Sequence, residues 1–256
     1  LELAYNPYAM DMPQEAVLLV GGYGTRLGEL AKKVPKAMLP VDGKPFLVYL
    51  LIWLKSQGIK RFVLACAHMA GEIEGYLGDG RRLGVSIVYS DAKDKQWGTA
   101  GSIKFAQDSI EGDAFFALNG DVFFENSLKD LWDFKCLKPA RACIALARVA
   151  DRRRYGTVLM DDDGYVKKFI EKDLAGAGGE GYINGGFYLF DRSVLDLIPA
   201  LEHASLEYDV VPKLVAAHAL TACAFPNGYF IDIGTPRDYE RAQAELPGRV
   251  SLNLYT

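Results

Sequence analysis

Several features that would mark a common class of protein are missing from this 256-residue sequence. Its longest apolar stretch, Phe46–Leu54, is far shorter than the about 20 residues of a membrane-spanning helix, so we predict a buried helix there. No secretion signal is visible. The four cysteines and three histidines are scattered, without the spacing of zinc ligands. We therefore expect a reduced, cytoplasmic protein that does not associate with membranes.

Charge and motif content exclude further classes of protein. A net charge of −4 argues against nucleic acid as a partner. The sequence has no Gly-x-Ser-x-Gly nucleophile motif and no Gly-Lys-Ser/Thr ending of a P-loop. Leu27 stands where the dinucleotide fingerprint requires a third glycine, which disfavours a nicotinamide-dependent dehydrogenase. Half of the residues are hydrophobic, enough for a full core.

The pattern of apolar runs indicates an α/β protein. In the first half, short apolar runs alternate with helical segments, which predicts a Rossmann-like, mostly parallel mixed sheet flanked by helices. Beyond Ala142, strands and a strong turn at 161–164 predict a smaller antiparallel β lobe. We expect one domain at 15–245, made of halves at 15–135 and 136–245, with a disordered lead at 1–14 and a tail at 246–256.

The glycine-rich stretch after the first predicted strand is the strongest candidate for a binding site. Gly21, Gly22 and Gly24 let the backbone approach a ligand closely, and the amide groups of such a turn suit phosphate oxygens. Arg26 adds a permanent positive charge, and Lys36, bracketed by prolines, adds a movable one. The alternative is an ordinary strand-to-helix turn with a surface arginine. The combined spacing favours a site for a triphosphate.

Two aspartates are candidate ligands for Mg²⁺. Asp121 follows a predicted central strand at its carboxyl end, where open α/β sheets bind ligands. Asp232 lies between isoleucines, where an acid is costly unless it is paired or bound to a metal. An aspartate after Asn-Gly is also typical of a plain turn, so Asp121 alone does not decide the question. Two acids that converge from distant strands on one Mg²⁺ would be a stronger signal.

Polar segments in the second half suit a second substrate. Lys172 could neutralise a phosphate and Glu171 could accept sugar hydroxyls, with a solvated charge pair as the alternative. Tyr155-Gly156 and Asn184-Gly185-Gly186 could bring backbone and amide groups to a polar ligand, or form a bulge or turn. Arg152–Arg154 is predicted to be a solvated basic patch, with an anion contact as the alternative.

Together these motifs resemble those of the sugar-1-phosphate nucleotidyltransferases (nucleoside-diphosphate-sugar pyrophosphorylases) over essentially all of 15–244. The match rests on the glycine loop with Pro35-Lys36, the Gly98–Gly101 segment, Asp121, the Glu171-Lys172 pair and Asp232 before Gly-Thr-Pro. Two departures are Gly28-Glu29-Leu30 in place of Pro-Leu-Thr, and Asp173 in place of a proline. The resemblance implies catalytic roles for Arg26, Lys36, Asp121 and Lys172, nucleotide binding by Gly21, Gly22, Gly24, Thr25, Arg26, Gln96, Gly98, Thr99 and Gly101, sugar-phosphate binding by Tyr155, Gly156, Glu171, Lys172, Asn184 and Gly185, and metal binding by Asp121 and Asp232.

The resemblance also implies a reaction. An oxygen of a sugar 1-phosphate would attack the α-phosphorus of a nucleoside triphosphate in line and expel pyrophosphate, with Mg²⁺ as cofactor. The nucleotide would bind the 15–135 half and the sugar phosphate the 136–245 half, in a protein that acts on small molecules and could form a homo-oligomer. Four segments look closest to D-glycero-α-D-manno-heptose 1-phosphate guanylyltransferases, which implies GTP and a GDP-heptose for surface polysaccharide: Lys44–Leu47, Tyr182–Gly186, Ser205–Glu207 and Tyr229–Tyr239.

Two other functions stay open at this point. One is uridylyl or thymidylyl transfer to a hexose or N-acetylmuramate 1-phosphate, because base choice depends on a few edge hydrogen bonds. The other is a non-catalytic nucleotide-sugar sensor on the same fold. The presence of Asp121 and Asp232 speaks against a sensor, which has no need of metal carboxylates.

Overall fold

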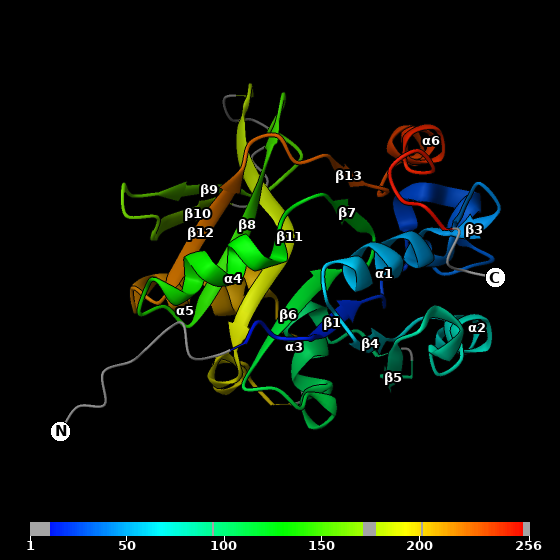
Figure 1. The fold of residues 1–256 in the computed structure, drawn as a ribbon, viewed down its shortest axis with the longest axis horizontal. Helices are drawn as coiled ribbons and strands as arrows, with labels where there is room; N and C mark the ends of the chain where they lie inside the picture. The colour runs from blue at the N-terminus through cyan, green and yellow to red at the C-terminus, as the bar shows by residue number, and fades with distance from the viewer. Residues whose placement is uncertain (1–10, 94, 171–177, 201, 253–256) are drawn as a thin grey trace.

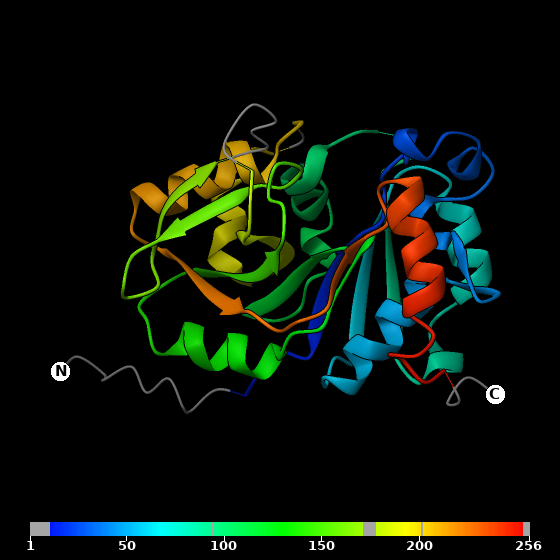
Figure 2. The ribbon, with the colours of Figure 1, turned by 90° about the horizontal axis from the view of Figure 1, so that it is seen from above.

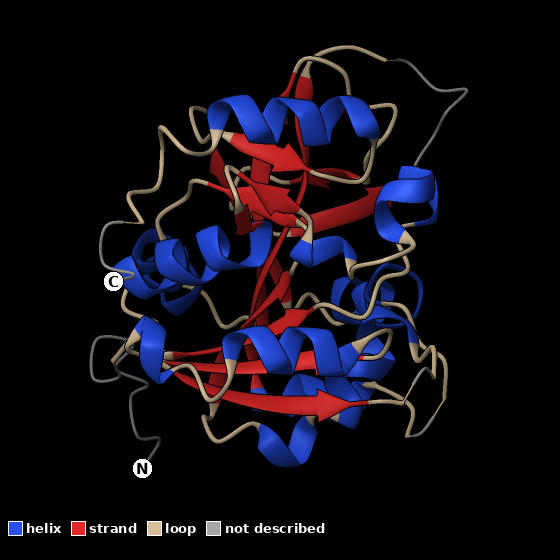
Figure 3. Cartoon of the chain, turned by 90° about the vertical axis from the view of Figure 1, so that its right-hand side faces the viewer, coloured by secondary structure: helices blue, strands red, loops and turns tan. Residues whose placement is uncertain are grey.

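The centre of the molecule is a mixed β-sheet with helices on both faces (Figures 1 and 3). A computed structural model describes residues 11–93, 95–170, 178–200 and 202–252. The parallel part of the sheet has the strand order β6-β1-β4-β5 and confirms the predicted Rossmann-like arrangement. Its strands are β1 Glu15–Leu19, β4 Arg61–Cys66, β5 Ser86–Asp91 and β6 Ala114–Asn119.

The antiparallel strands of the second half continue this sheet. β11 Gly181–Asp191 explains the continuity, because it pairs antiparallel with β6 on one side and with β8 Ala142–Val149 on the other. The predicted hairpin around 161–164 is present, and Gly164 supports its turn with a φ of 83°. The remaining strands of the sheet are β9 Thr157–Met160 and β10 Val166–Ile170, which form the hairpin, and β12 Leu220–Phe225, which runs parallel to β8.

The helices cover both faces because successive strand residues point to opposite sides. Ala16 and Leu18 of β1 belong to one core, together with α1, α2, α4 and α6. Val17 belongs to a second core with α3 and α5 on the other face (Figure 2). The helices are α1 Phe46–Ser56, α2 Ala70–Leu77, α3 Gly98–Phe105, α4 Leu128–Cys136, α5 Val211–Ala216 and α6 Pro236–Glu245, and the short 3₁₀ and π segments are η2 Thr25–Ala31, η3 Lys36–Met38, η4 Arg81–Leu83, η5 Gln107–Ser109, η6 Arg192–Leu197 and η7 Leu206–Val210.

Helix α1 is the buried helix that its apolar run predicts. Every residue from Phe46 to Leu54 is buried, so the helix has no polar face over this stretch. Its apolarity therefore serves the protein core. Within the described ranges, none of the helices has the length and apolar character needed to cross a membrane.

Two short ribbons stand apart from the main sheet. β2 Pro40–Val41 pairs with β3 Lys44–Pro45 just before α1. β7 Val122–Phe124 pairs antiparallel with β13 Phe230–Asp232, with Asp232 opposite Val122. The second ribbon matters for the site, because it ties the chain after β6 to the chain before α6.

Candidate functional site

A cavity of about 390 Å³ opens at the carboxyl ends of β1, β4 and β6. It lies where the strand order reverses, since β4 and β5 extend the sheet to one side of β1 and β6 lies on the other. Open α/β sheets bind ligands at such a switch point. Seven residues predicted for the site line this cavity: Gly21, Gly22, Lys36, Gln96, Gly98, Thr99 and Asp121.

The glycines of the loop after β1 occupy their positions for different structural reasons. A Cβ on Gly21 would lie 3.1 Å from the Cβ of Ala67, whereas nothing lies within 4 Å of one on Gly22. Gly24 has a φ of 62°, and its Cβ would come within 2.8 Å of the Ala31 Cβ. Gly22 therefore leaves room beside the cavity, whereas position 24 needs glycine because of its positive φ and its close contact with Ala31.

The following residues lie farther from the cavity than expected. Thr25 and Arg26 are exposed at the start of η2, and neither lines the cavity, nor does Gly24. A role of Arg26 at the phosphates therefore requires its side chain or the loop to move, and it stays a prediction.

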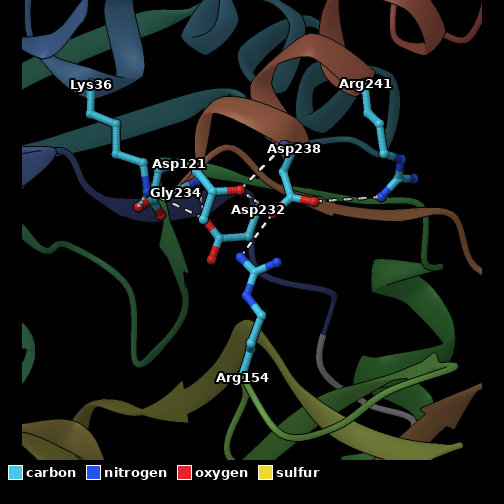
Figure 4. A network of polar contacts seen from close by, with 8 residues as sticks. Lys36, Asp121, Arg154, Asp232, Gly234, Asp238 and Arg241 are labelled. Carbon is cyan, nitrogen blue, oxygen red and sulfur yellow. Dashed lines mark hydrogen bonds and ion pairs between the residues drawn. The ribbon is translucent and has the colours of Figure 1, made fainter. Parts of the chain in front are cut away.

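Lys36 brings the two predicted metal ligands together. Its Nζ donates a hydrogen bond to Asp121 and another to Asp232 Oδ1, at 3.2 Å (Figure 4). The Lys36 side chain is only 11% exposed, so the ammonium group depends on these carboxylates. Burial lowers the pKa of Lys36, but the two aspartates outweigh it and raise the pKa above its usual 10.5. Lys36 is therefore a firmly charged centre between the aspartates.

The β7–β13 ribbon explains how acids so far apart in the sequence meet. Asp121 directly precedes β7, and Asp232 ends β13. The Ile233 amide donates to the Asp121 carbonyl at 3.1 Å, which holds the two segments in register. A Cβ on Gly234 would lie 2.9 Å from Asp232 Oδ1 and 3.1 Å from Lys36 Nζ, so this position has no room for a side chain.

The two carboxylates are close enough to perturb each other. Burial and the charge of Asp121 raise the pKa of Asp232 above its usual 3.8, although Lys36 and the Gly234 amide act in the opposite direction. A carboxylate pair that needs a cation between its members is a typical setting for a divalent metal ion.

The start of α3 is fixed by the segment around Ala204. A Cβ on Gly98 would lie 2.4 Å from the Ala204 carbonyl oxygen, and the Gly101 amide donates to that oxygen at 3.1 Å. The Thr99 hydroxyl donates to Glu207 at 3.2 Å. Close packing against this segment thus explains why positions 98 and 101 are glycines. Gln96, Gly98 and Thr99 line the cavity and Gly101 does not; nucleotide binding by all four stays a prediction.

Four of the residues predicted for the sugar phosphate are described by the structure, and they lie near the β7–β13 ribbon: Tyr155, Gly156, Asn184 and Gly185. Tyr155 packs edge-on against Phe230 of β13, with ring centroids 5.6 Å apart. The Gly156 carbonyl accepts a hydrogen bond from the Asn184 amide at 2.8 Å. Gly185 lies in a bulge of β11, where a Cβ would lie 2.8 Å from the Ala145 carbonyl oxygen. The bulge considered as the alternative is therefore present, and sugar binding here stays a prediction.

Two predicted residues, Glu171 and Lys172, lie outside the described residues. Sequence reasoning also missed residues that line the cavity. Each of them stands in or next to a motif already singled out, and that adjacency is the signal that could have found them: Tyr23, Lys95, Trp97 and Asn119.

Comparison with known proteins identifies the family. Residues 15–248 match the family described as nucleotidyl transferase. The chain belongs to this family. The resemblance predicted from the motifs is thereby confirmed, and with it the expectation of an enzyme that acts on small molecules.

Relatives of two kinds are similar to the chain. A D-glycero-alpha-D-manno-heptose 1-phosphate guanylyltransferase from Campylobacter jejuni is 38% identical over 88% of this chain and 96% of its own length. The enzyme of the same name from Aneurinibacillus thermoaerophilus is 36% identical over 91% and 98%. A mannose-1-phosphate guanylyltransferase from Mycobacterium tuberculosis is 36% identical over 91% of this chain, which spans only 64% of that relative.

Solved structures agree with the fold. The crystal structure of HddC from Yersinia pseudotuberculosis has a TM-score of 0.79 and 32% identity, covering 90% of this chain and 98% of its own. A putative glucose-1-phosphate thymidylyltransferase from Bacillus anthracis has a TM-score of 0.82 at 24% identity, covering 94% and 98%. The second likeness supports the fold alone.

Proposed function

We propose that the protein transfers a guanylyl group from GTP to a sugar 1-phosphate and releases pyrophosphate. The observation that carries the proposal is the Lys36–Asp121–Asp232 cluster beside a cavity at the switch point of the sheet. The choice of guanine is supported by relatives of both kinds, which are named guanylyltransferases.

For the sugar we propose D-glycero-α-D-manno-heptose 1-phosphate. The chain matches 96% and 98% of the length of two relatives named for this substrate, but only 64% of the mannose relative. The product would be GDP-heptose, an activated sugar for surface polysaccharide. Mannose 1-phosphate is the second candidate, because the identities to the two kinds of relative are similar.

The residues present fit a divalent cation. Asp121 and Asp232 supply hard oxygen donors that both reach one cationic group, the Lys36 ammonium. No cluster of three or more His, Cys, Asp or Glu side chains suited to a metal occurs in the described part of the chain. Two carboxylates completed by substrate phosphates is the arrangement that Mg²⁺ prefers, so we propose Mg²⁺ as the ion. When bound, it would neutralise the triphosphate and polarise the α-phosphate.

The chain's own residues would act by position and charge. The loop at Gly22 leaves room for the triphosphate at the end of β1. Lys36 would shift from the aspartates toward the α-phosphate and stabilise the charge that develops there. The attacking sugar phosphate is already ionised at neutral pH, so its oxygen forms the new bond to phosphorus as the pyrophosphate oxygen leaves. No general base is needed.

Pyrophosphate release tests the proposal. The purified protein is assayed with Mg²⁺ and each of GTP, ATP, UTP and dTTP against heptose, mannose, glucose and N-acetylmuramate 1-phosphates. Release confined to GTP with the heptose phosphate is the expected result. Another productive pair would replace the substrates and keep the reaction. Silence across the panel, with nucleotide binding intact, would replace the enzyme by a nucleotide-sugar sensor.

A further inference from the structure

Arg154 differs from its two neighbours in the basic run 152–154. Arg153 bonds within its own loop, where its Nε donates to Asp151 Oδ2 at 2.9 Å. Arg154 instead reaches α6, where its Nη2 donates to Asp238 Oδ2 at 2.8 Å (Figure 4). The three arginines of the predicted solvated patch therefore differ, because Arg154 is tied to the distant helix α6.

Asp238 is a rigid support for this arginine. Its side chain is only 9% exposed. The Thr235 hydroxyl donates to Asp238 Oδ2 at 2.6 Å and accepts from the Asp238 amide at 3.3 Å, so the pair caps the start of α6. The oxygen that anchors Arg154 is thus itself fixed by the helix cap.

The anchored guanidinium lies beside the aspartate cluster. Arg154 approaches Asp232 from one side, and Lys36 contacts Asp232 from another (Figure 4). The next residue, Tyr155, packs on Phe230, two residues before Asp232. Both residues of the loop are therefore attached to the segment that carries Asp232, and a positive charge from the second half of the chain faces the site.

The guanidinium has capacity for an anion. Arginine carries five N–H donors in a planar fork that matches phosphate oxygens. Among the described residues, Asp238 accepts a hydrogen bond from the Arg154 guanidinium, and the Arg154 side chain remains 42% exposed. The guanidinium therefore keeps N–H donors accessible that a phosphate could bind.

We propose that Arg154 binds the phosphate of the sugar 1-phosphate and that Asp238 positions Arg154 for this contact. The inference rests on the proposed function, since it names a further binding residue of the same site. Lys36 and Arg154 then flank the reacting phosphates from the two halves of the chain, and the oxygen that attacks is brought next to Asp232.

The test compares three variants in the pyrophosphate assay with GTP and the heptose 1-phosphate. Arg154→Gln is expected to raise the KM for the sugar phosphate roughly tenfold to hundredfold, as for the loss of a charge-assisted bond, with the KM for GTP unchanged. Arg154→Lys is expected to recover part of the loss. Arg153→Gln is the matched control and should behave as the wild type, because Arg153 bonds to its own loop.

The outcomes separate this proposal from the proposed function. Equal changes in both KM values, or a lower melting temperature as the sole effect of Arg154→Gln, would reduce Arg154 to a structural tie and overturn the proposal. If the wild type turns over no pair in the panel, calorimetric binding of the heptose 1-phosphate decides instead. Weaker binding to Arg154→Gln than to the wild type supports the proposal, and equal binding or no binding to the wild type refutes it.

Discussion

The two halves of the molecule place their site residues by different means. In the parallel half, Gly21, Gly22 and Asp121 lie within three residues of the carboxyl ends of β1 and β6, so the sheet itself places them at the cavity. In the antiparallel half, Asp232 and Arg154 depend on contacts between distant segments, namely the β7–β13 ribbon and the cap of α6. Local sequence thus determines the first set, and tertiary pairing determines the second.

Lys36 is the point where the two halves meet, and its removal should have the largest effect. Lys36→Met is expected to lower turnover roughly hundredfold or more, because a charge at the reacting phosphate is lost. The same variant should bind Mn²⁺ about tenfold more tightly without GTP, measured by electron paramagnetic resonance, because Lys36 no longer competes for Asp121 and Asp232.

Lys33→Met serves as the control, since Lys33 is exposed a short distance away in the sequence. It should leave both turnover and Mn²⁺ affinity unchanged. Unchanged or weaker Mn²⁺ binding by Lys36→Met would mean that Lys36 helps to build the metal site. Lys36 would then be a part of the metal site in both halves of the chain, and it would not compete with the metal ion for Asp121 and Asp232.

Two glycines sharpen the comparison within the parallel half. Gly24→Ala is expected to destabilise the protein by about 2 kcal/mol, because Gly24 has a φ of 62° and a Cβ would meet Ala31. In a thermal melt this corresponds to about 2–4 °C for each kcal/mol. Gly22→Ala should melt like the wild type, since its Cβ has open space, and instead raise the KM for GTP. Equal shifts in melting temperature for both variants would show that both glycines are needed for the backbone conformation of the loop. Room for the phosphates would then not be the reason for Gly22.

The same division explains what could be predicted from the sequence. Strand and helix order in the parallel half follows from apolar periodicity. The apolar run Phe46–Leu54 predicted a buried helix, and α1 covers this run and ends two residues later at Ser56. The pairing of β13 with β7 could not be predicted, because three-residue strands carry no periodic signal and their partners lie far away in the sequence. The residue patterns alone therefore did not place Asp121 beside Asp232. The family resemblance predicted them as a metal-binding pair, and the structure shows both in contact with Lys36.

Two further differences have identifiable causes. Helix α4 was missed although its signals were present, with Ser127 as the N-cap and Leu128, Leu131 and Trp132 at helical spacing. Arg154 was grouped with Arg153, because a run of like charges gives no indication of which member finds a buried partner. That partner, Asp238, lies on the distant helix α6.

The smallest expected effect tests the α6 anchor of the antiparallel half. Burial by itself raises the pKa of Asp238, but the hydrogen bonds from Thr235 and Arg154 outweigh it and lower the pKa below the usual 3.8. A carboxyl whose pKa is lower in the folded state stabilises the protein above its unfolded pKa, and this contribution disappears as the pH falls through the folded value. Asp238→Asn should therefore cost about 1 kcal/mol near neutral pH.

The difference between Asp238→Asn and the wild type should close as the pH is lowered below 3.8. Chemical denaturation of both proteins across this range measures it, and Asp162→Asn, in the exposed β9–β10 turn, corrects for general acid effects. If the stability difference persists at the lowest pH, the contact between Asp238 and Arg154 depends on shape and hydrogen bonding and does not depend on the charge of Asp238. Arg154 would then be held by packing on Tyr155 and β13, and the second half of the site would be less dependent on ion pairing than the Lys36 cluster is.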